Sequence, residues 1–268
     1  MSELKSGVDL NSEFSSLGFE DKKQKVLQKF GGLAFSESGN IVSRESALPN
    51  GKPVDSYVEW VVNKLRRPLE AAAHSPVIQG WKSNGVDSRI EKFLTGGGPE
   101  KVLAGVDQHQ KCLIHGDFTI SNILFDGDAK KVTALLGFDW SSVSHPYDQI
   151  SSCLHDIGCN VDCEDGNIGP AILSGNFSTP PAHLDEKTTE KWQLAKEWYT
   201  AMKKSGVVTS GDMKGVDNIR DMSRLHGLLC PFKLGNENEL KEMDDETKAD
   251  LRAKTEADLV QWLQKHGF

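Results

Sequence analysis

The sequence lacks any long apolar run. No uninterrupted apolar stretch approaches the ~18 residues that a helix needs to cross a bilayer. Residues 1–30 are charged and mixed, without the apolar core of a secretory signal. Neither a membrane-spanning nor a secreted protein is therefore expected, and these absences predict a soluble, cytoplasmic protein.

An excess of basic charge is also missing. The chain has 31 Lys and Arg residues against 39 Asp and Glu residues, which gives a net charge of −8, and no long basic run interrupts this balance. Nucleic acids and anionic membranes attract clustered positive charge. We therefore expect neither as a partner. The expected partner is a small-molecule substrate, and the sequence leaves the oligomeric state open.

Cysteines are few and odd in number. There are five in 268 residues, of which 37% are hydrophobic. A chain of this size has enough apolar side chains to build a core without disulfides, so reduced thiols are expected. We predict a partly ordered lead-in over residues 1–18 and a single domain over residues 19–268.

The hydrophobic residues that are present recur mainly at the three- and four-residue spacings of amphipathic helices. This pattern predicts helices over residues 20–30, 55–72, 149–157, 186–204, 213–229 and 244–266. Pro68 is expected to bend or end the second of these. A hairpin is predicted over 35–42 and a long loop over 160–185. The glycines of 96–98 lack the preceding strand and the Gly-Lys-Ser/Thr ending of a phosphate-binding loop, which predicts a flexible connector.

Residues 112–148 carry most of the recognisable chemistry. An apolar run ends at His115, a glycine and Asp117, and Asn122 follows five residues after the aspartate. A second apolar run then ends in Gly-Phe-Asp-Trp. A kinase catalytic loop and its metal-binding strand have this layout: the aspartate accepts the proton of a substrate hydroxyl, and the asparagine binds magnesium. The alternative is that Asp117 is a turn aspartate that caps the loop backbone.

Two details of this run point to one family. Gly116 stands where protein kinases have arginine, and the second run ends in Asp139 and Trp140. With these residues the chain resembles the aminoglycoside phosphotransferase (APH) family of small-molecule kinases. The run from Phe138 to Pro146 is similar to the fungal branch of that family. The resemblance is specific over residues 113–158.

The resemblance implies a mainly α fold with a small β component, namely the protein-kinase-like helical C-lobe of that family. Family members carry a β-rich nucleotide lobe ahead of this point. Here 114 residues precede His115, and no strand-borne Val-Ala-x-Lys or glycine-rich hairpin occurs before residue 60. We therefore expect a truncated N-lobe that lacks the usual nucleotide site.

The family pattern also implies roles for single residues. Asp117 would be the catalytic acid or base, with Asn122 beside it. His115 would organise the loop by packing and hydrogen-bonding under the metal-binding strand. Asp148 would brace the loop from below as structural support.

The second metal ligand departs from the pattern. The family's magnesium-binding aspartate would fall at position 137, where this chain has Gly137. Asp139 is two residues further along. On a strand it would project from the same face ~7 Å away. Asp139 would therefore bind magnesium with Asn122 only if the loop shifts, and otherwise it makes structural hydrogen bonds at the strand end.

Two other groups of residues are candidates for a site. His155, Cys159 and Cys163 lie four residues apart, but Gly158 and Asn160 interrupt the helix, so we interpret their spacing as chance rather than as a zinc site. His226 and several aromatic residues are candidates for lining a substrate cleft, although most such aromatics form core. The aromatic candidates are Trp192, Trp198, Tyr199 and Phe232.

These observations leave three hypotheses. In the first, the protein is a degenerate family member in which Asp117 performs acid/base chemistry on a small organic molecule without ATP, in an isomerisation, cyclisation or elimination, as in specialised metabolism. The second is an active small-molecule kinase with ATP and Mg²⁺ as cofactors, and with Asn122 and a displaced Asp139 on the metal. The third is a non-catalytic pseudokinase that acts as a binding module. The first needs no cofactor.

Overall fold

The computed structural model describes residues 8–9, 54–129, 131–153, 168–180 and 185–268. By their internal contacts, the described residues divide into two compact units. We call the unit drawn from 1–44 and 109–216 the loop unit, and the unit drawn from 45–108 and 217–268 the helical unit. Each is described by itself. The prediction of a single domain over 19–268 stays a prediction.

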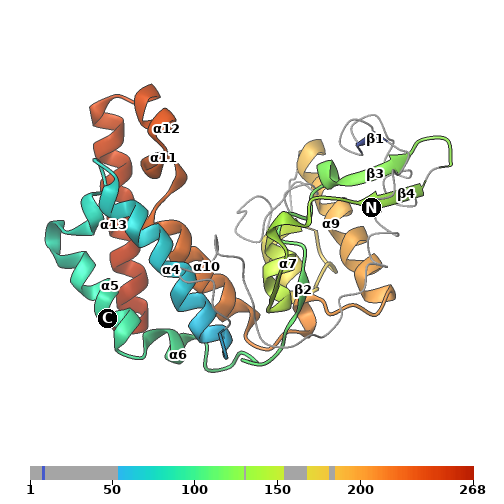
Figure 1. Ribbon diagram of the computed structural model, residues 1–268, viewed down its shortest axis with the longest axis horizontal. Coiled ribbons are helices and arrows are strands. Elements are labelled where there is room, and N and C mark those ends of the chain that lie inside the picture. Colours follow the sequence, from blue (N-terminus) through green and yellow to red (C-terminus); the bar gives the residue numbers. More distant parts are fainter. Residues whose placement is uncertain (1–7, 10–53, 130, 154–167, 181–184) are drawn as a thin grey trace. The chain divides into compact units, whose positions relative to one another are not determined.

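Helices make up the described part of the helical unit (Figure 1). They are α4 (Tyr57–His74), α5 (Val86–Thr95), α6 (Gly98–Val102), α10 (Val216–Leu229), α11 (Phe232–Gly235), α12 (Glu237–Glu242) and α13 (Asp245–His266). Ser56 caps α4 by accepting the Glu59 N–H at 3.2 Å. The helices predicted over 55–72, 213–229 and 244–266 are confirmed. Pro68 lies inside α4 and does not end it.

The helical unit has a core of large apolar side chains. Trp81 is fully buried, and its indole Nε1 donates to the Leu229 carbonyl at 2.8 Å. The ring of Phe93 makes edge contacts with Trp262, at a centroid distance of 5.0 Å, and with Phe268, at 5.2 Å. Aromatic pairs in this geometry add to the stabilisation that burial provides. This core joins helices that lie far apart in the sequence.

The glycines between α5 and α6 form a tight connection rather than the flexible one predicted. Gly97 has a φ of +79°, which favours glycine, and precedes the first residue of α6. At Gly98, a Cβ would lie 2.2 Å from the ring of Phe93. These glycines therefore permit a turn and a close helix contact.

Two small antiparallel sheets lie in the loop unit. Strand β2 (Cys112–Ile114) pairs with β5 (Ser142–Ser144). Strand β3 (Ile123–Asp126) lies between β1 (Val8–Asp9) and β4 (Lys131–Leu135). The strands expected in the two apolar runs are present, whereas β1 and β5 were not predicted.

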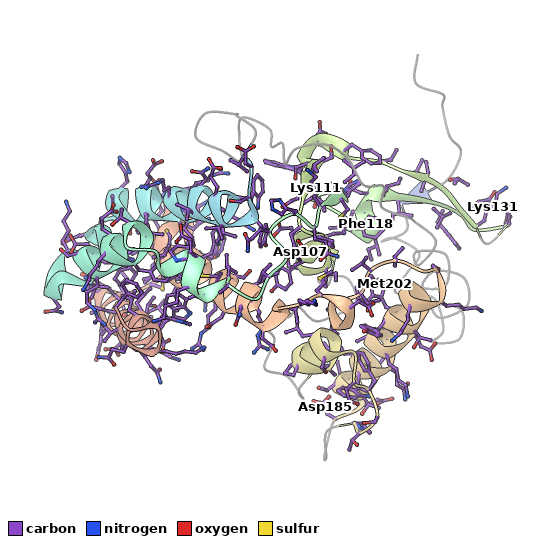
Figure 2. All side chains as sticks on the ribbon, turned by 90° about the horizontal axis from the view of Figure 1, so that it is seen from below. Asp107, Lys111, Phe118, Lys131, Asp185 and Met202 are labelled. Carbon is purple, nitrogen blue, oxygen red and sulfur yellow. The ribbon has the colours of Figure 1, made fainter. Side chains whose placement is uncertain are left out.

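The β3–β4 hairpin holds the segment that follows Asp117. Ile123 and Phe125 of β3 are buried, and Phe118 and Ile120 pack against them. Figure 2 shows Phe118 near the loop end of the hairpin and Lys131 at its far end. Burial of these apolar side chains therefore anchors both sides of the loop that carries Asn122.

Three helices complete the described loop unit: α7 (Pro146–Cys153), α8 (Ile168–Ser174) and α9 (Glu186–Lys204). The prediction of a helix over 186–204 is confirmed. The predicted loop over 160–185 is wrong where α8 lies, because Ile168, Ile172 and Leu173 are buried and Pro170 stands in the first turn, where proline is tolerated.

The fold class is mainly α with small sheets, as predicted. None of the helices within the described ranges is long and apolar enough to cross a membrane. Several predictions fall outside the described residues. They are the lead-in apart from residues 8–9, the helix over 20–30, the hairpin over 35–42, the truncated N-lobe, and the positions of His155, Cys159 and Cys163.

Candidate active site

The loop that carries Asp117 begins where β2 ends. The main-chain N–H of His115 donates to the Oε1 atom of Gln149, on α7, at 2.6 Å. Both residues are buried, so the loop cannot move away from α7 without leaving that N–H without its partner. Gln149 thus fixes the start of the loop, a role that the sequence did not predict.

The ring of His115 fixes the loop on its other side. Nε2 lies 2.7 Å from the carbonyl oxygen of Leu136, just beyond β4. Because a carbonyl can only accept, Nε2 carries the hydrogen. The ring also contacts Phe138, at a centroid distance of 4.7 Å, and His115 is 4% exposed. This burial suits a positioning residue better than one that exchanges protons with a substrate.

Asp117 and Asn122 are in direct contact. The Nδ2 of Asn122 donates to the Oδ2 of Asp117 at 2.8 Å and to the Asp117 carbonyl at 2.7 Å. Because both of these Asp117 oxygens are acceptors, the nitrogen of the Asn122 amide must face Asp117. The other carboxylate oxygen of Asp117, Oδ1, has no hydrogen-bond partner among the residues that the structure describes. That atom is free to accept a proton from a substrate.

Gly116 allows the loop to lie directly on the turn that follows β4. Its φ is +79°, and a Cβ at this position would lie 2.1 Å from the carbonyl oxygen of Trp140. Any side chain would therefore collide with main chain. This close approach explains why position 116, one of the residues that carry the family resemblance, is glycine.

Gly137 stands where the family's metal-binding aspartate would be. Its φ is +75°, and a Cβ there would lie 2.7 Å from the Oδ1 of Asn122. The side-chain amide of Asn122 therefore occupies the space in which a side chain at position 137 would begin. In this conformation the position cannot carry a ligand.

The premise that Asp139 continues a strand is wrong. Strand β4 ends at Leu135, the main chain turns at Gly137, and Phe138–Trp140 form a single 3-10 turn. Asp139 is exposed on that turn. The strand spacing that would have placed Asp139 on the same face as position 137 does not apply, because the strand ends before position 137. Its role as a metal ligand stays a prediction.

The residues present fit a magnesium ion poorly. Magnesium binds oxygen atoms in near-octahedral geometry. Asn122 directs its nitrogen toward Asp117 and its oxygen toward the main chain of Gly137. Within the described ranges, no group of three His, Cys, Asp or Glu side chains could hold a metal ion. We derive no chemical step through a metal at this site.

The β2–β5 ladder below the loop is held by a buried carboxylate. Asp148, in the first turn of α7, accepts a hydrogen bond from the Ser144 hydroxyl of β5. Burial, and to a smaller extent the nearby charge of Asp148, raises the pKa of the Cys112 thiol to about 12. Cys112 therefore stays a protonated thiol and is no candidate nucleophile.

An apolar surface lies next to Asp117. Leu136, Phe138 and Trp140 are 43%, 49% and 55% exposed. The contacts of Phe138 with His115 and of Trp140 with Gly116 place this surface at the loop. Sequence reasoning missed it, although the alternation of apolar residues beyond β4 was visible.

The aromatic residues considered for a cleft have different surroundings. Trp192, Trp198 and Tyr199 are 5–6% exposed on α9 of the loop unit, so they are core residues. Phe232 is 69% exposed at the start of α11, in the helical unit. His226 is half-buried on α10. The structure does not bring these residues together within one unit.

The segment that contains the loop is also the segment that matches a known family. No curated protein matches the chain. A family model does: residues 56–167, which contain the loop from His115 to Asn122 and the turn at Gly137, match the model of the phosphotransferase enzyme family, APH.

Proposed function

We propose that this phosphotransferase-family protein uses Asp117 for acid/base chemistry on a small organic molecule without transferring a phosphoryl group. The observation that carries the proposal is the contact between Asn122 and Gly137. It puts the amide of Asn122 where a metal-binding side chain would begin, and leaves the carboxylate of Asp117 in place. Without a metal to stabilise the developing charge, the activation barrier of phosphoryl transfer typically rises by several kcal/mol.

The chemistry follows from the two oxygens of Asp117. Asn122 holds Oδ2, which orients the carboxylate, while Oδ1 takes a proton from a hydroxyl or an acidic C–H of the substrate. The same atom returns the proton elsewhere on the molecule in an isomerisation or cyclisation, or to the leaving group in an elimination. His115 and Gln149 position the loop during these steps and exchange no protons.

The surface beside Asp117 favours a substrate with an apolar part. Phe138 and Trp140 present exposed aromatic rings there, and aromatic side chains contribute large contact areas to ligand binding. We therefore propose a substrate that joins an apolar or aromatic part to the group that loses the proton.

The family match favours a second candidate, an active ATP-dependent small-molecule kinase. In this case Asp117 deprotonates a substrate hydroxyl, the Asn122 amide turns its oxygen away from Gly137, and Asp139 moves to share the metal. Turning the Asn122 amide breaks its hydrogen bond to Asp117, which holds the loop in the present structure.

One experiment separates the candidates. The protein is incubated with an extract of small metabolites, with and without ATP–Mg²⁺, and the products are compared by untargeted mass spectrometry. We expect conversion without ATP that Asp117→Asn abolishes, while the melting temperature stays nearly unchanged because asparagine is isosteric. Asp139→Asn and the exposed control Asp128→Asn are expected to retain the conversion.

Other results have defined meanings. Conversion that requires ATP, is lost in Asp139→Asn and accompanies a rise in melting temperature with ATP–Mg²⁺ would establish the kinase instead. Conversion that persists in Asp117→Asn would remove Asp117 from the mechanism. An absence of any conversion, with or without ATP, would favour the binding module.

A further inference from the structure

The apolar surface beside Asp117 is a cluster rather than a scatter of side chains. Leu136, Phe138 and Trp140 are three of the six large hydrophobic side chains that are exposed among the described residues, and they fall within five positions of the chain. Exposed apolar residues that occur singly need no explanation, whereas a cluster marks a binding surface. The chemistry around this cluster indicates what it binds.

The ring of Phe138 is the outer member of a row of three rings. It contacts the ring of His115 at a centroid distance of 4.7 Å, and His115 contacts Phe118 at 5.8 Å. Phe118, labelled in Figure 2, packs against the buried side chains of Ile123 and Phe125. The row is therefore rooted in the core of the loop unit, while its outermost ring is 49% exposed.

Main-chain contacts hold the turn that carries both exposed aromatic residues. The N–H and the hydroxyl of Ser141 donate to the carbonyl of Phe138, at 3.1 and 2.7 Å. The main-chain carbonyl of Trp140 lies so close to Gly116 that no side chain fits there, which places Trp140 at the residue before Asp117. The surface is thus ordered before any ligand arrives, and this lowers the entropic cost of binding.

No positive charge neutralises the carboxylate of Asp117. None of the Lys, Arg and His side chains in the described part of the chain forms an ion pair with it. An anionic ligand is therefore repelled. A hydroxyl group that gives up its proton here also finds no cation to stabilise the resulting oxyanion. A phenol stabilises that charge within its own ring, and its ordinary pKa is about 10, as in tyrosine.

We propose that the site binds a neutral, planar phenol, whose ring lies on Phe138 and Trp140 and whose hydroxyl donates to the Oδ1 of Asp117. This inference rests on the proposed function, because it names a substrate class for the same carboxylate. In the first step the phenol O–H bond breaks, its electron pair stays on the phenol oxygen, and the proton moves to Oδ1. An aliphatic alcohol lacks the ring that contacts the two aromatic side chains and that spreads the negative charge.

The first test measures binding of 6-fluoro-2-naphthol to the full chain by fluorine NMR at pH 7. We expect a dissociation constant of about 0.1–1 mM. Phe138→Leu keeps most of the apolar volume but removes the ring, and should weaken binding about threefold to tenfold. The matched control Phe232→Leu changes an exposed phenylalanine of the helical unit and should leave the affinity unchanged.

A second variant keeps the test decisive if Phe138→Leu does not fold, since Phe138 packs against His115. Trp140→Ala removes a side chain that is 55% exposed, and should weaken naphthol binding at least about tenfold. Circular dichroism melting checks that each variant is folded.

Other probes test the hydroxyl and the charge. 2-Fluoro-6-methoxynaphthalene has the same ring but no O–H to donate, so it should bind at least about tenfold more weakly than the naphthol. The anion 6-fluoro-2-naphthoate should also bind at least about tenfold more weakly, because Asp117 repels it. Asp117→Asn should weaken binding of the naphthol and leave that of the methyl ether unchanged, because a neutral amide is a weaker acceptor than a carboxylate.

Failure of this inference can be told apart from failure of the proposed function. Equal binding of the naphthol and either comparison probe, undiminished binding in both aromatic variants, or no naphthol binding at about 5 mM would each overturn the phenol assignment. Conversion by Asp117 would then still stand for a substrate of another class. Conversion that requires ATP–Mg²⁺ would overturn the proposed function alone, because the binding measurements contain no nucleotide.

Discussion

The contacts inside the helical unit differ in kind from the contacts inside the loop unit. In the helical unit, large buried side chains such as Trp81 and Phe93 pack between helices, and single polar ties add to that packing. In the loop unit, the segment around Asp117 is held by the close approach of Gly116 to the Trp140 main chain and of Gly137 to the Asn122 side chain, and by hydrogen bonds of His115. Helix packing tolerates small changes of side chain, whereas a Cβ added at Gly116 or Gly137 would lie 2.1 or 2.7 Å from a neighbouring atom.

The loop unit therefore depends on the identity of single residues more than the helical unit does. The helical unit needs apolar residues of about the right size at the right spacing. The loop needs particular residues, because Gly116, Gly137 and Gln149 have no substitutes that preserve the same contacts. Substitutions in each unit test this contrast.

The largest effect is expected from Gly116→Ala. Alanine would have to adopt a φ of +79° and place its Cβ against the Trp140 carbonyl, so we expect a loss of about 3–5 kcal/mol in the free energy of unfolding. The matched control is Gly227→Ala in the exposed face of α10, where a Cβ meets no atom within 4 Å. That change should stabilise the protein by about 0.5–1 kcal/mol. Urea unfolding measures both, and equal effects would contradict the contrast.

The next largest effect is expected from Gln149→Leu. Leucine keeps most of the volume but leaves the buried His115 N–H without its acceptor, which should cost about 1–3 kcal/mol of stability. Amide hydrogen exchange should show faster exchange of the loop amides, with the helices of the helical unit unchanged. Unaltered protection of the loop would show that Gln149 does not hold it.

A smaller effect is expected in the helical unit from Asp221→Asn. Asp221 accepts hydrogen bonds from the Trp262 indole at 3.0 Å, Lys265 at 2.7 Å and His266 at 2.8 Å, and so ties α10 to α13. Its burial alone would raise the pKa of Asp221, but the hydrogen bonds from Lys265 and His266 outweigh burial and lower it. Because Lys265 is largely exposed, solvent weakens this pair, and we expect a loss of about 1 kcal/mol near pH 7.

The pH dependence of this tie has a defined sign. A carboxyl group whose pKa is lower in the folded state adds stability above the unfolded pKa of about 3.9, and that stability is lost as the pH falls through the folded pKa. The difference in unfolding free energy between wild type and Asp221→Asn should therefore shrink below about pH 4. Urea unfolding at pH 7 and pH 3 measures it. A difference that grew on acidification would contradict this assignment.

Much of the helical framework could be read from the sequence. The spacing of apolar residues predicted α4, α9, α10 and α13, because one buried face per helix leaves a periodic pattern. The short helix α8 was missed, since seven residues are too few to show a period and Gly and Pro dominate its surroundings. The adjacency of Asp117 and Asn122 could be predicted because both lie in one short loop of a recognisable motif.

Only the tertiary structure decided what Gly137, Gln149 and Asp139 do. Gly137 was visible as a departure from the family pattern, but its close contact with Asn122 depends on the register of the β3–β4 hairpin, in which Ile123 pairs with Leu135. Gln149 lies 34 residues from the N–H that it accepts, and no local pattern encodes such a contact. The sequence by itself determined the loop and its resemblance to the phosphotransferase family, because the local spacing of residues carries both. The lack of room for a side chain at position 137 depends on the pairing of β3 with β4, which sets Asn122 beside Gly137.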